Sequence, residues 1–553
     1  MPHQAAWSHR DRGVHLRGTR RVRVGRDAAV SAALCRAAWV LAWLLVLTGG
    51  TPEASARQAG QEPIVYTIRF PDPETHIADV VAVVPTSGAS SVDLMLPVWS
   101  PGFYGLGDYA ANVQEFAVRT ASGDPLTFEK PKPNHWMVPT GGATHIIVSY
   151  GLLCQSRFVT GNWVGSDHAV INGPPTYITP SDETIRRPRE VHLELPEAWP
   201  SSITSLEAAP DGLPHHYRAP DYDVFIDSPI VAGTISTHAF EVAGVPHVLA
   251  DFGDLGAWDG RAAAAMLKPI VEEHAKLFRG VPYERYVFLN AFRRGGGGLE
   301  HLNSTLLTSG ANPTEPLPSL RWLKFVSHEH CHAFNVKRLR PIELGPFDYE
   351  QLPRTPSLWI SEGLTTYYGD LAVVRSGIGS PEDFLLGLSG HIRAVQTAPG
   401  RLVQTLEQAS LTAGRSSSSG IGGDRDTTVS YYSKGAVVGF LLDARIRRLT
   451  DGARSLDDVM RPAYERYSGE RGFRPEEFQA IASEVAGADL SAFFRTMLTT
   501  TEELDYTESL DWFGLQFVDP GSTEPAQAWR LEMRTDATPA QKANWALLLN
   551  PIP

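Results

Sequence analysis

Hydrophobic positions follow two different periods along this chain, and the change between them divides it. Between residues 62 and 250, short alternating or apolar segments recur, separated by clusters of Pro, Gly, Asp and Ser. A period of two places successive side chains on opposite faces of a strand, and the separating residues are typical of turns. The pattern predicts antiparallel strands, in a sandwich or saddle arrangement, over 64–70, 79–84, 92–98, 144–150 and 190–195.

Near residue 255 the apolar spacing lengthens to that of helices. Residues 260–278 keep this spacing and end at Arg279-Gly280, which favours a helix end, and 286–292 reads as one more strand. Further helices are predicted over 320–337 (ended by Pro341), from 357, and over 381–396, 436–449, 455–467 and 475–486; residues 412–427 read as a Ser/Gly-rich loop. We therefore expect an α+β multidomain protein, with a β-rich domain over 62–250, a mostly α-helical domain over 255–502, and a short tail over 503–553.

The first 56 residues have the order of a secretory signal peptide. Arginines gather over 10–26, an apolar run covers 37–47, and Ala54-Ser55-Ala56 offers a cleavage site. The run is too short for a typical membrane span. We expect export to the periplasm or the medium; the alternative is a membrane anchor through an uncleaved segment.

Composition, net charge and cysteine count narrow the class of protein but do not indicate its function. Hydrophobic residues make up 42% of the 553 residues and charged residues 20%, as in ordinary globular proteins. The net charge of −13 gives no general case for a nucleic-acid partner. Of three cysteines, Cys35 falls in the signal segment, so Cys154 and Cys331 make no disulfide framework.

The strongest chemical signal is S-H-E-H-C-H-A-F-N at residues 327–335, which contains an H-E-x-x-H motif. On a helix, His328 and His332 are one turn apart and project from the same face, where two imidazoles can hold one side of a tetrahedral Zn²⁺. Glu329 lies beside that face and could deprotonate an activated water. The sequence therefore predicts one Zn²⁺ per chain, with Glu329 as general base.

The two residues inside the motif are sorted by helix geometry. His330 lies about 200° around the helix from His328 and points away. Cys331 is only about 60° from His328 and remains a rival ligand, although a small core residue is the favoured interpretation.

A catalytic zinc needs a third protein ligand. Glu362, in W-I-S-E-G-L-T-T-Y-Y, is the leading candidate because a helix–loop–helix could bring it beside the histidines. The alternative is an ordinary solvated glutamate on a helix. Upstream, residues 295–298 are four consecutive glycines, which form either a flexible turn or an edge where an extended peptide backbone can approach closely.

Several segments in this order resemble one family. H-E-x-x-H followed by W-x-x-E-G-x-x-x-Y is similar to the gluzincin metallopeptidases. Gly297-Gly298-Leu299-Glu300-His301, His332–Arg338 and Tyr431-Tyr432-Ser433-Lys434-Gly435 narrow the resemblance to the glycyl-aminopeptidase family, metallopeptidase family sixty-one, over roughly 62–510. Members usually carry a C-terminal PDZ domain; fewer than 50 residues follow Leu510, so we expect none here.

The resemblance implies a thermolysin-like catalytic domain over 255–502 and assigns further residues. Glu300 would bind the free α-amine of the substrate, and the backbone of Gly297 and Gly298 would pair with the peptide. Tyr432 would donate to the oxyanion of the tetrahedral intermediate, with Tyr431 as the rival.

The predicted function is a zinc aminopeptidase that removes small N-terminal residues, of the Gly or Ala type, from peptides with a free N-terminus. The alternatives are a zinc endopeptidase on the same scaffold and a zinc-stabilised binding protein without catalysis.

Overall fold

The computed structural model describes residues 61–182, 187–293, 296–309, 318–414 and 424–550. The predicted signal segment 1–56 and the centre of the predicted loop 412–427 lie outside these ranges. Within them, every helix is too short or too polar to cross a membrane.

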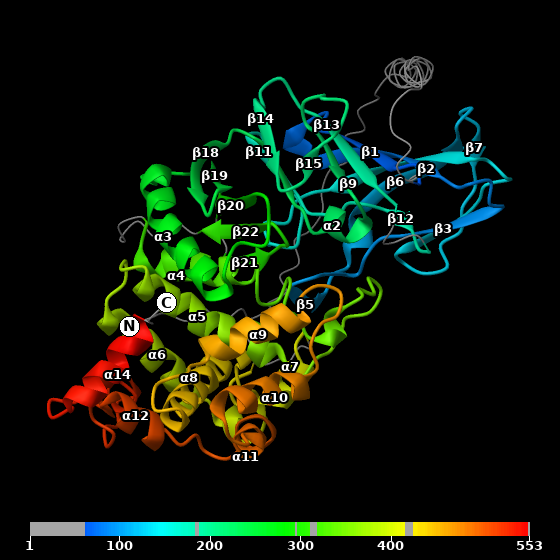
Figure 1. The fold of residues 1–553 in the computed structure, drawn as a ribbon. Helices are drawn as coiled ribbons and strands as arrows, with labels where there is room; N and C mark the ends of the chain where they lie inside the picture. The colour runs from blue at the N-terminus through cyan, green and yellow to red at the C-terminus, as the bar shows by residue number, and fades with distance from the viewer. Residues whose placement is uncertain (1–60, 183–186, 294–295, 310–317, 415–423, 551–553) are drawn as a thin grey trace, which may run out of the picture. The chain divides into compact units, whose positions relative to one another are not determined.

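The N-terminal part is built on a sheet that is antiparallel apart from one pair of strands (Figure 1). The eight-stranded order is β15 (Glu207–Ala208), β16 (His216–Ala219), β13 (Arg189–Glu194), β1 (Ile64–Arg69), β2 (Ile77–Pro85), β9 (His145–Leu153), β6 (Val113–Thr120) and β7 (Pro125–Leu126). The parallel pair is β1 and β13. Buried and half-buried positions alternate along β2 and β9, as the period of two predicts, because one face of the sheet covers a core.

That core is closed by a three-stranded sheet, β12 (Thr179–Pro180), β3 (Ser91–Met95) and β8 (His135–Pro139). Beside it, strands β4 (Trp99–Ser100) and β5 (Phe103–Leu106) form a small hairpin. A four-stranded sheet, β10 (Trp163–Val164), β11 (His168–Ile171), β17 (Ile230–Gly233) and β14 (Ser201–Thr204), completes this half.

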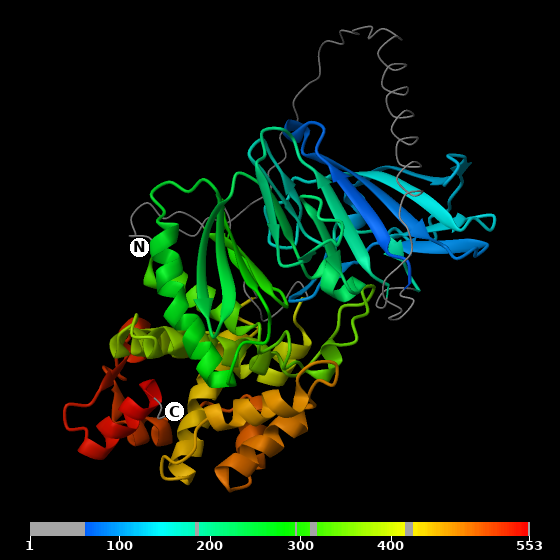
Figure 2. The same cartoon turned by 45° about the horizontal axis from the view of Figure 1, so that its top comes forward.

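A five-stranded mixed sheet links the two halves of the molecule. Its order is β18 (Ser236–Val242), β19 (Val245–Gly253), β20 (Tyr286–Phe292), β22 (Ser304–Ser309) and β21 (Gly297–Glu300), so β21 is an edge strand. Side chains alternate across β20: Val287 and Leu289 pack toward β11 and β17, whereas Tyr286 and Phe288 pack toward the helices. Figures 1 and 2 show α3 (Gly260–Phe278) lying along this sheet.

The helical half confirms the predicted fold class. Its main elements are α4 (Leu320–Cys331), η5 (Trp359–Leu364), α5 (Thr365–Arg375), α6 (Pro381–Gln396), α7 (Leu406–Leu411), α8 (Tyr431–Leu449), α9 (Asp457–Tyr467), α10 (Pro475–Ala486) and α11 (Ser491–Phe494). The last segment adds α12 (Thr507–Phe513), β23 (Leu515–Phe517), α13 (Pro525–Ala528), β24 (Leu531–Met533) and α14 (Pro539–Leu549), whose Phe513, Trp545 and Leu548 are buried in the same core as the preceding helices.

The expectation of one helix over 320–337 was wrong at its C-terminal end. Helix α4 ends at Cys331, and a series of turns carries the chain to Arg338, well before Pro341. Asn335 explains the change, because its side-chain amide donates to Ile360 O at 2.8 Å and to Thr365 Oγ1 at 3.0 Å. These bonds tie the turn to the next helix and compete with regular helical pairing.

The segment that carries Glu362 is not a regular helix either. η5 is a π-helical turn that runs directly into α5, and such turns are frequent at functional sites. It lies in backbone contact with α8: a Cβ on Gly435 would come within 2.8 Å of Gly363 Cα and of Trp359 O. Glycines at both positions therefore allow α8 to reach the metal-site region.

We expect Gly435→Ala to destabilise the fold by about 1–3 kcal/mol, because the added methyl group has no space against a neighbouring backbone. The midpoint of thermal unfolding should fall by several degrees. Gly390→Ala in α6 is the matched control, since nothing lies within 4 Å of its added Cβ. That control should be neutral or stabilising by about 0.5–1 kcal/mol. Equal midpoints for the two variants would contradict the contact.

Candidate metal centre and active site

Three side chains from two separate elements converge on one point. His328 lies in the last turn of α4, His332 is the residue directly after that helix, and Glu362 belongs to η5. The two Nε2 atoms are 3.0 Å apart, and Glu362 Oε2 lies 3.6 Å from His328 Nε2 and 3.3 Å from His332 Nε2. Bonds of about 2.0–2.1 Å at tetrahedral angles would place ligand atoms about 3.3–3.4 Å apart. The donor spacing therefore fits a tetrahedral zinc site with its fourth position open.

The hydrogen-bond partners of the two imidazoles fix their tautomers. His332 Nδ1 lies 2.9 Å from Asn335 O, which can only accept, so Nδ1 carries the hydrogen. Thr366 Oγ1 donates to Glu362 O at 2.8 Å and accepts from His328 Nδ1 at 3.3 Å. Both Nε2 atoms therefore face the carboxylate of Glu362, an arrangement that a metal ion or a proton between them would satisfy.

Three buried carboxylate oxygens without hydrogen-bond partners also favour a cation at this position. Glu300 Oε1, Glu329 Oε2 and Glu362 Oε1 are buried and have no hydrogen-bond partner among the residues that the structure describes. Glu300, Glu329 and His332 also lie within 4.8 Å of one another through their ligating atoms. Burial by itself would lower the pKa of His332. The negative charges of Glu362 and Glu300 have the larger combined effect and raise this pKa to about 10. The cluster has an excess of negative charge that a divalent cation would neutralise.

Glu329 lies beside the three donors. Burial, reinforced by the charges of Glu300 and Glu362, raises its pKa to about 8 although His332 opposes the shift. A Cβ on Gly298 would come within 2.2 Å of the Glu329 carboxyl carbon. Gly298 therefore gives the carboxylate its space, a role that the sequence did not suggest.

Glu300 is the last residue of the edge strand β21, and its carboxylate lies within 4.8 Å of the ligating atoms of Glu329 and His332. Burial is the main cause that raises its pKa to about 6; His332 opposes the shift and Glu362 adds to it. Gly102, in the β4–β5 hairpin, lies against this carboxylate, because an added Cβ would be 2.6 Å from Glu300 Oε1. Gly297, at the start of β21, has open space around its added Cβ and a φ of +112°.

Two adjacent tyrosines at the start of α8 face the cluster. The rings of Tyr431 and Tyr432 stack with centroids 4.8 Å apart, and the Tyr432 ring lies 6.1 Å from that of His328. Burial and the charge of Glu362 raise the pKa of both phenols. Both therefore stay protonated and can donate a hydrogen bond.

Tyr104 is a site residue that sequence reasoning missed. It belongs to β5 yet packs into the core of the helical half, and its buried hydroxyl has no hydrogen-bond partner among the described residues. Burial, followed by the charges of Glu362 and Glu300, raises the pKa of its phenol. The available signal was an aromatic residue among glycines, in P-G-F-Y-G-L-G at 101–107.

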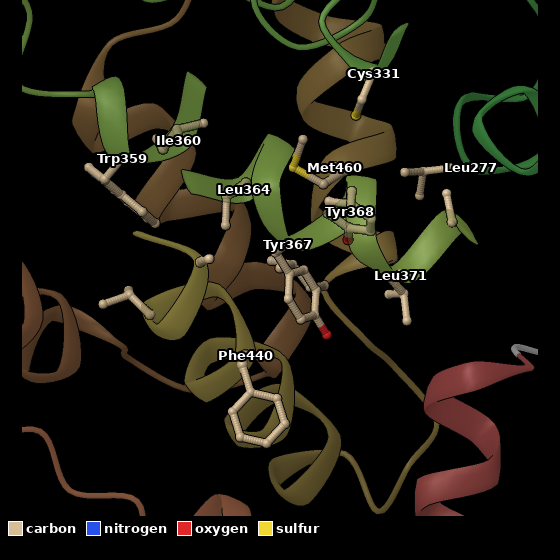
Figure 3. Packing of buried hydrophobic residues seen from close by; sticks show 14 of the residues in the cluster. Leu277, Cys331, Trp359, Ile360, Leu364, Tyr367, Tyr368, Leu371, Phe440 and Met460 are labelled. Atoms are coloured by element: carbon tan, nitrogen blue, oxygen red, sulfur yellow. The ribbon is translucent and has the colours of Figure 1, made fainter. Parts of the chain in front are cut away.

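The two inner residues of the motif lie elsewhere. The His330 ring forms hydrogen bonds with His274 Nδ1 at 2.8 Å and with the Tyr283 hydroxyl at 2.7 Å, so it points away from the proposed metal ligands. Cys331 lies among buried side chains around Tyr368 and Met460 (Figure 3). Its sulfur belongs to neither group of converging ligand atoms among the described residues, so it is not a ligand of this site. Burial raises the pKa of its thiol to about 12. Cys154 and Cys331 are both buried free thiols.

Two models of one family match this chain. The Peptidase M61 N-terminal domain matches residues 65–234, and M61 glycyl aminopeptidase matches residues 321–438, together more than half of the chain. The chain belongs to the M61 glycyl aminopeptidase family. The predicted family and the predicted peptidase activity are confirmed. Within the M61 matches lie His328, Glu329, His332, Glu362 and Tyr432, whereas Gly297, Gly298 and Glu300 lie between them.

Solved structures agree with the M61 assignment. The crystal structure of an aminopeptidase N family protein from Idiomarina loihiensis has a TM-score of 0.75 and 25% identity, covering 82% of this chain and 78% of that one. An M1 zinc metallopeptidase from Deinococcus radiodurans has a TM-score of 0.50 and 14% identity, covering 81% and 96%, and shows the fold alone. A search of curated proteins found no match.

We expect Glu362→Gln to weaken Zn²⁺ binding by on the order of 100-fold, because the amide is a poor substitute for the carboxylate ligand. Glu329→Gln should bind zinc within about threefold of the parent, since its carboxylate is not a ligand. Competition with a chromogenic chelator measures both affinities without reference to activity. Equal weakening in the two variants would show that Glu329 is a ligand.

Proposed function

We propose that this M61 protein is a zinc-dependent aminopeptidase that removes small N-terminal residues from peptides. One observation carries the proposal: His328, His332 and Glu362 converge with tetrahedral spacing, and the buried carboxylates of Glu329 and Glu300 lie beside them. This arrangement provides a metal site, a base and an anchor for an ammonium group within one small volume.

His328, His332 and Glu362 would hold the zinc. When bound, the ion activates a water molecule and polarises the carbonyl of the first peptide bond. Glu329 accepts a proton from that water and passes it to the leaving amine nitrogen, so one carboxyl serves first as base and then as acid. Its buried position beside His332 suits both roles.

Glu300 selects the substrate. Its unpaired Oε1 can accept a hydrogen bond from the N-terminal ammonium, and the neutralised pair then fits a buried environment. An internal peptide bond brings no ammonium and would leave the carboxylate buried and unpaired, which disfavours binding. No described strand pairs with the outer edge of β21, so its backbone at Gly297 and Gly298 can pair with an extended peptide.

Tyr432 supplies the remaining electrostatic contribution. Its phenol stays protonated and can donate to the carbonyl oxygen as negative charge develops there in the transition state. Tyr431, the rival, lies against it and is more deeply buried. A preference for N-terminal Gly rests on the family description, and its extension to Ala, another small residue, is part of the proposal.

Export is proposed from the signal-like order of residues 1–56. The N-terminal residue of the mature protein, read directly, tests it: a start after Ala56 is expected, and retention of the apolar run 37–47 would indicate an anchor instead.

The decisive experiment compares glycyl and alanyl p-nitroanilides with their N-acetylated forms. Turnover of the free-amine substrates alone is expected, with loss of activity on chelation and its return with Zn²⁺. Cleavage of blocked substrates at a similar rate would establish an endopeptidase. Zinc binding without turnover of any peptide would instead establish a binding protein.

Tyr432→Phe should lower kcat by roughly 100-fold with little change in KM, because the donor acts mainly in the transition state. Tyr431→Phe is the matched control one residue away and should keep most of the activity. Steady-state kinetics on the alanyl anilide separates the two parameters. The opposite ranking of the variants would assign the role to Tyr431.

A further inference from the structure

Asp227 is a buried carboxylate that the mechanism does not use. It follows the short helix α2 (Tyr222–Ile226), precedes β17 in the N-terminal half, and is 8% exposed. Its oxygens lie 3.1 Å from His301 Nδ1, 2.7 Å from the backbone nitrogen of Leu302 and 2.7 Å from Lys337 Nζ. One side chain of the N-terminal half thus binds three groups of the catalytic half.

The three partners belong to the two segments that flank the active site. His301 and Leu302 directly follow Glu300, at the end of β21. Lys337 lies five residues beyond the metal-site residue His332, in the turns that follow α4. Asp227 therefore joins the segment of the amine anchor to the segment of the metal site.

The ion pair between Asp227 and Lys337 is buried. Only 7% of the Lys337 side chain and 9% of the Asp227 side chain are exposed. Burial opposes charge on Asp227, but Lys337 and His301 outweigh it and lower its pKa. Because a buried ion is costly once it loses a partner, these contacts hold one well-defined geometry.

The strand that carries Glu300 needs such support. Among the described residues, β21 is an edge strand that pairs with β22 alone. The turn after it is also held by Arg338, which donates to Leu302 O at 2.8 Å and to Asn303 Oδ1 at 2.9 Å. Asp227 and Arg338 thus fix the turn, and the Glu300 carboxylate projects from the residue before it.

We propose that Asp227 is a positioning residue for the substrate amine: by binding His301, Leu302 and Lys337 it sets the distance between the Glu300 carboxylate and the metal site. The inference rests on the proposed role of Glu300 as amine anchor. It also makes the N-terminal half a determinant of exopeptidase binding rather than only a cover for the catalytic half.

The test is a double-mutant cycle on glycyl p-nitroanilide with Asp227→Asn and Glu300→Gln in the full chain. Asp227→Asn replaces one carboxylate oxygen, an acceptor, by an amide NH₂ group, a donor. The partners of Asp227 at Leu302 and Lys337 are themselves donors, so a hydrogen bond is lost. The substitution should therefore raise KM by on the order of tenfold, with kcat changed by less than about threefold. In the Glu300→Gln background the same substitution should change KM by less than about twofold, because the anchor is already lost. Additive effects in the cycle would overturn the proposal.

Two controls make the result specific. Asp223→Asn removes a carboxylate of the same helix that is bonded to the Tyr349 hydroxyl, and it should leave KM unchanged. His301→Leu keeps the Asp227–Lys337 ion pair and should raise KM by about threefold, which keeps the test available if Asp227→Asn fails to fold. An unchanged KM in a folded, zinc-loaded His301→Leu protein would then overturn the proposal.

Failure of the anchor itself would be distinct from failure of this inference. If Glu300→Gln alone leaves KM unchanged, the proposed role of Glu300 is wrong, and the role of Asp227 falls with it. If Glu300→Gln raises KM and Asp227→Asn does not, the anchor stands and Asp227 does not position it. Bound zinc per chain should equal that of the parent in every variant.

Discussion

The burial of three carboxylates in one small volume is the constraint on which the rest of this structure depends. Glu300, Glu329 and Glu362 are each at most 6% exposed, and each has an oxygen that no described residue pairs. Charges of one sign taken out of water repel one another and lose their hydration, so they persist only around a cation or a proton. The two Nε2 lone pairs directed at the same point make a metal ion the partner that satisfies all of them.

Bringing these groups together requires close backbone approaches, and glycines provide them. Gly298 leaves space for the Glu329 carboxylate and Gly102 leaves space for that of Glu300. Gly363 and Gly435 let the π-helical turn of Glu362 touch the helix of Tyr432. The side chains of the proposed site are thus positioned by glycines, so we expect substitutions of these glycines to disturb the site although the glycines have no side chain to take part in the reaction.

The hydrogen bonds that orient the site come from residues with no catalytic chemistry of their own. Asn335 binds His332 through its carbonyl and the next helix through its side chain. Thr366 joins His328 to the backbone of Glu362. Asp227, in the N-terminal half, accepts a hydrogen bond from the backbone of Leu302, and Tyr104, in the β4–β5 hairpin, packs into the core of the helical half. The N-terminal half therefore takes part in building the site.

The sequence by itself determined the change from a β-rich to a mostly helical part near residue 255, because periodicity is a local property. It also determined the motif of His328, Glu329 and His332, because i,i+4 spacing needs no tertiary information. It also offered Glu362 as the third ligand through its place at the start of the next helix, and Glu300 and Tyr432 through the family resemblance. Only the tertiary structure decided that α4 stops at Cys331, that Glu362 sits in a π-helical turn, and that Tyr104 and Asp227 meet the site. Those outcomes depend on contacts between segments tens to hundreds of residues apart, and no pattern within a local window of sequence contains them.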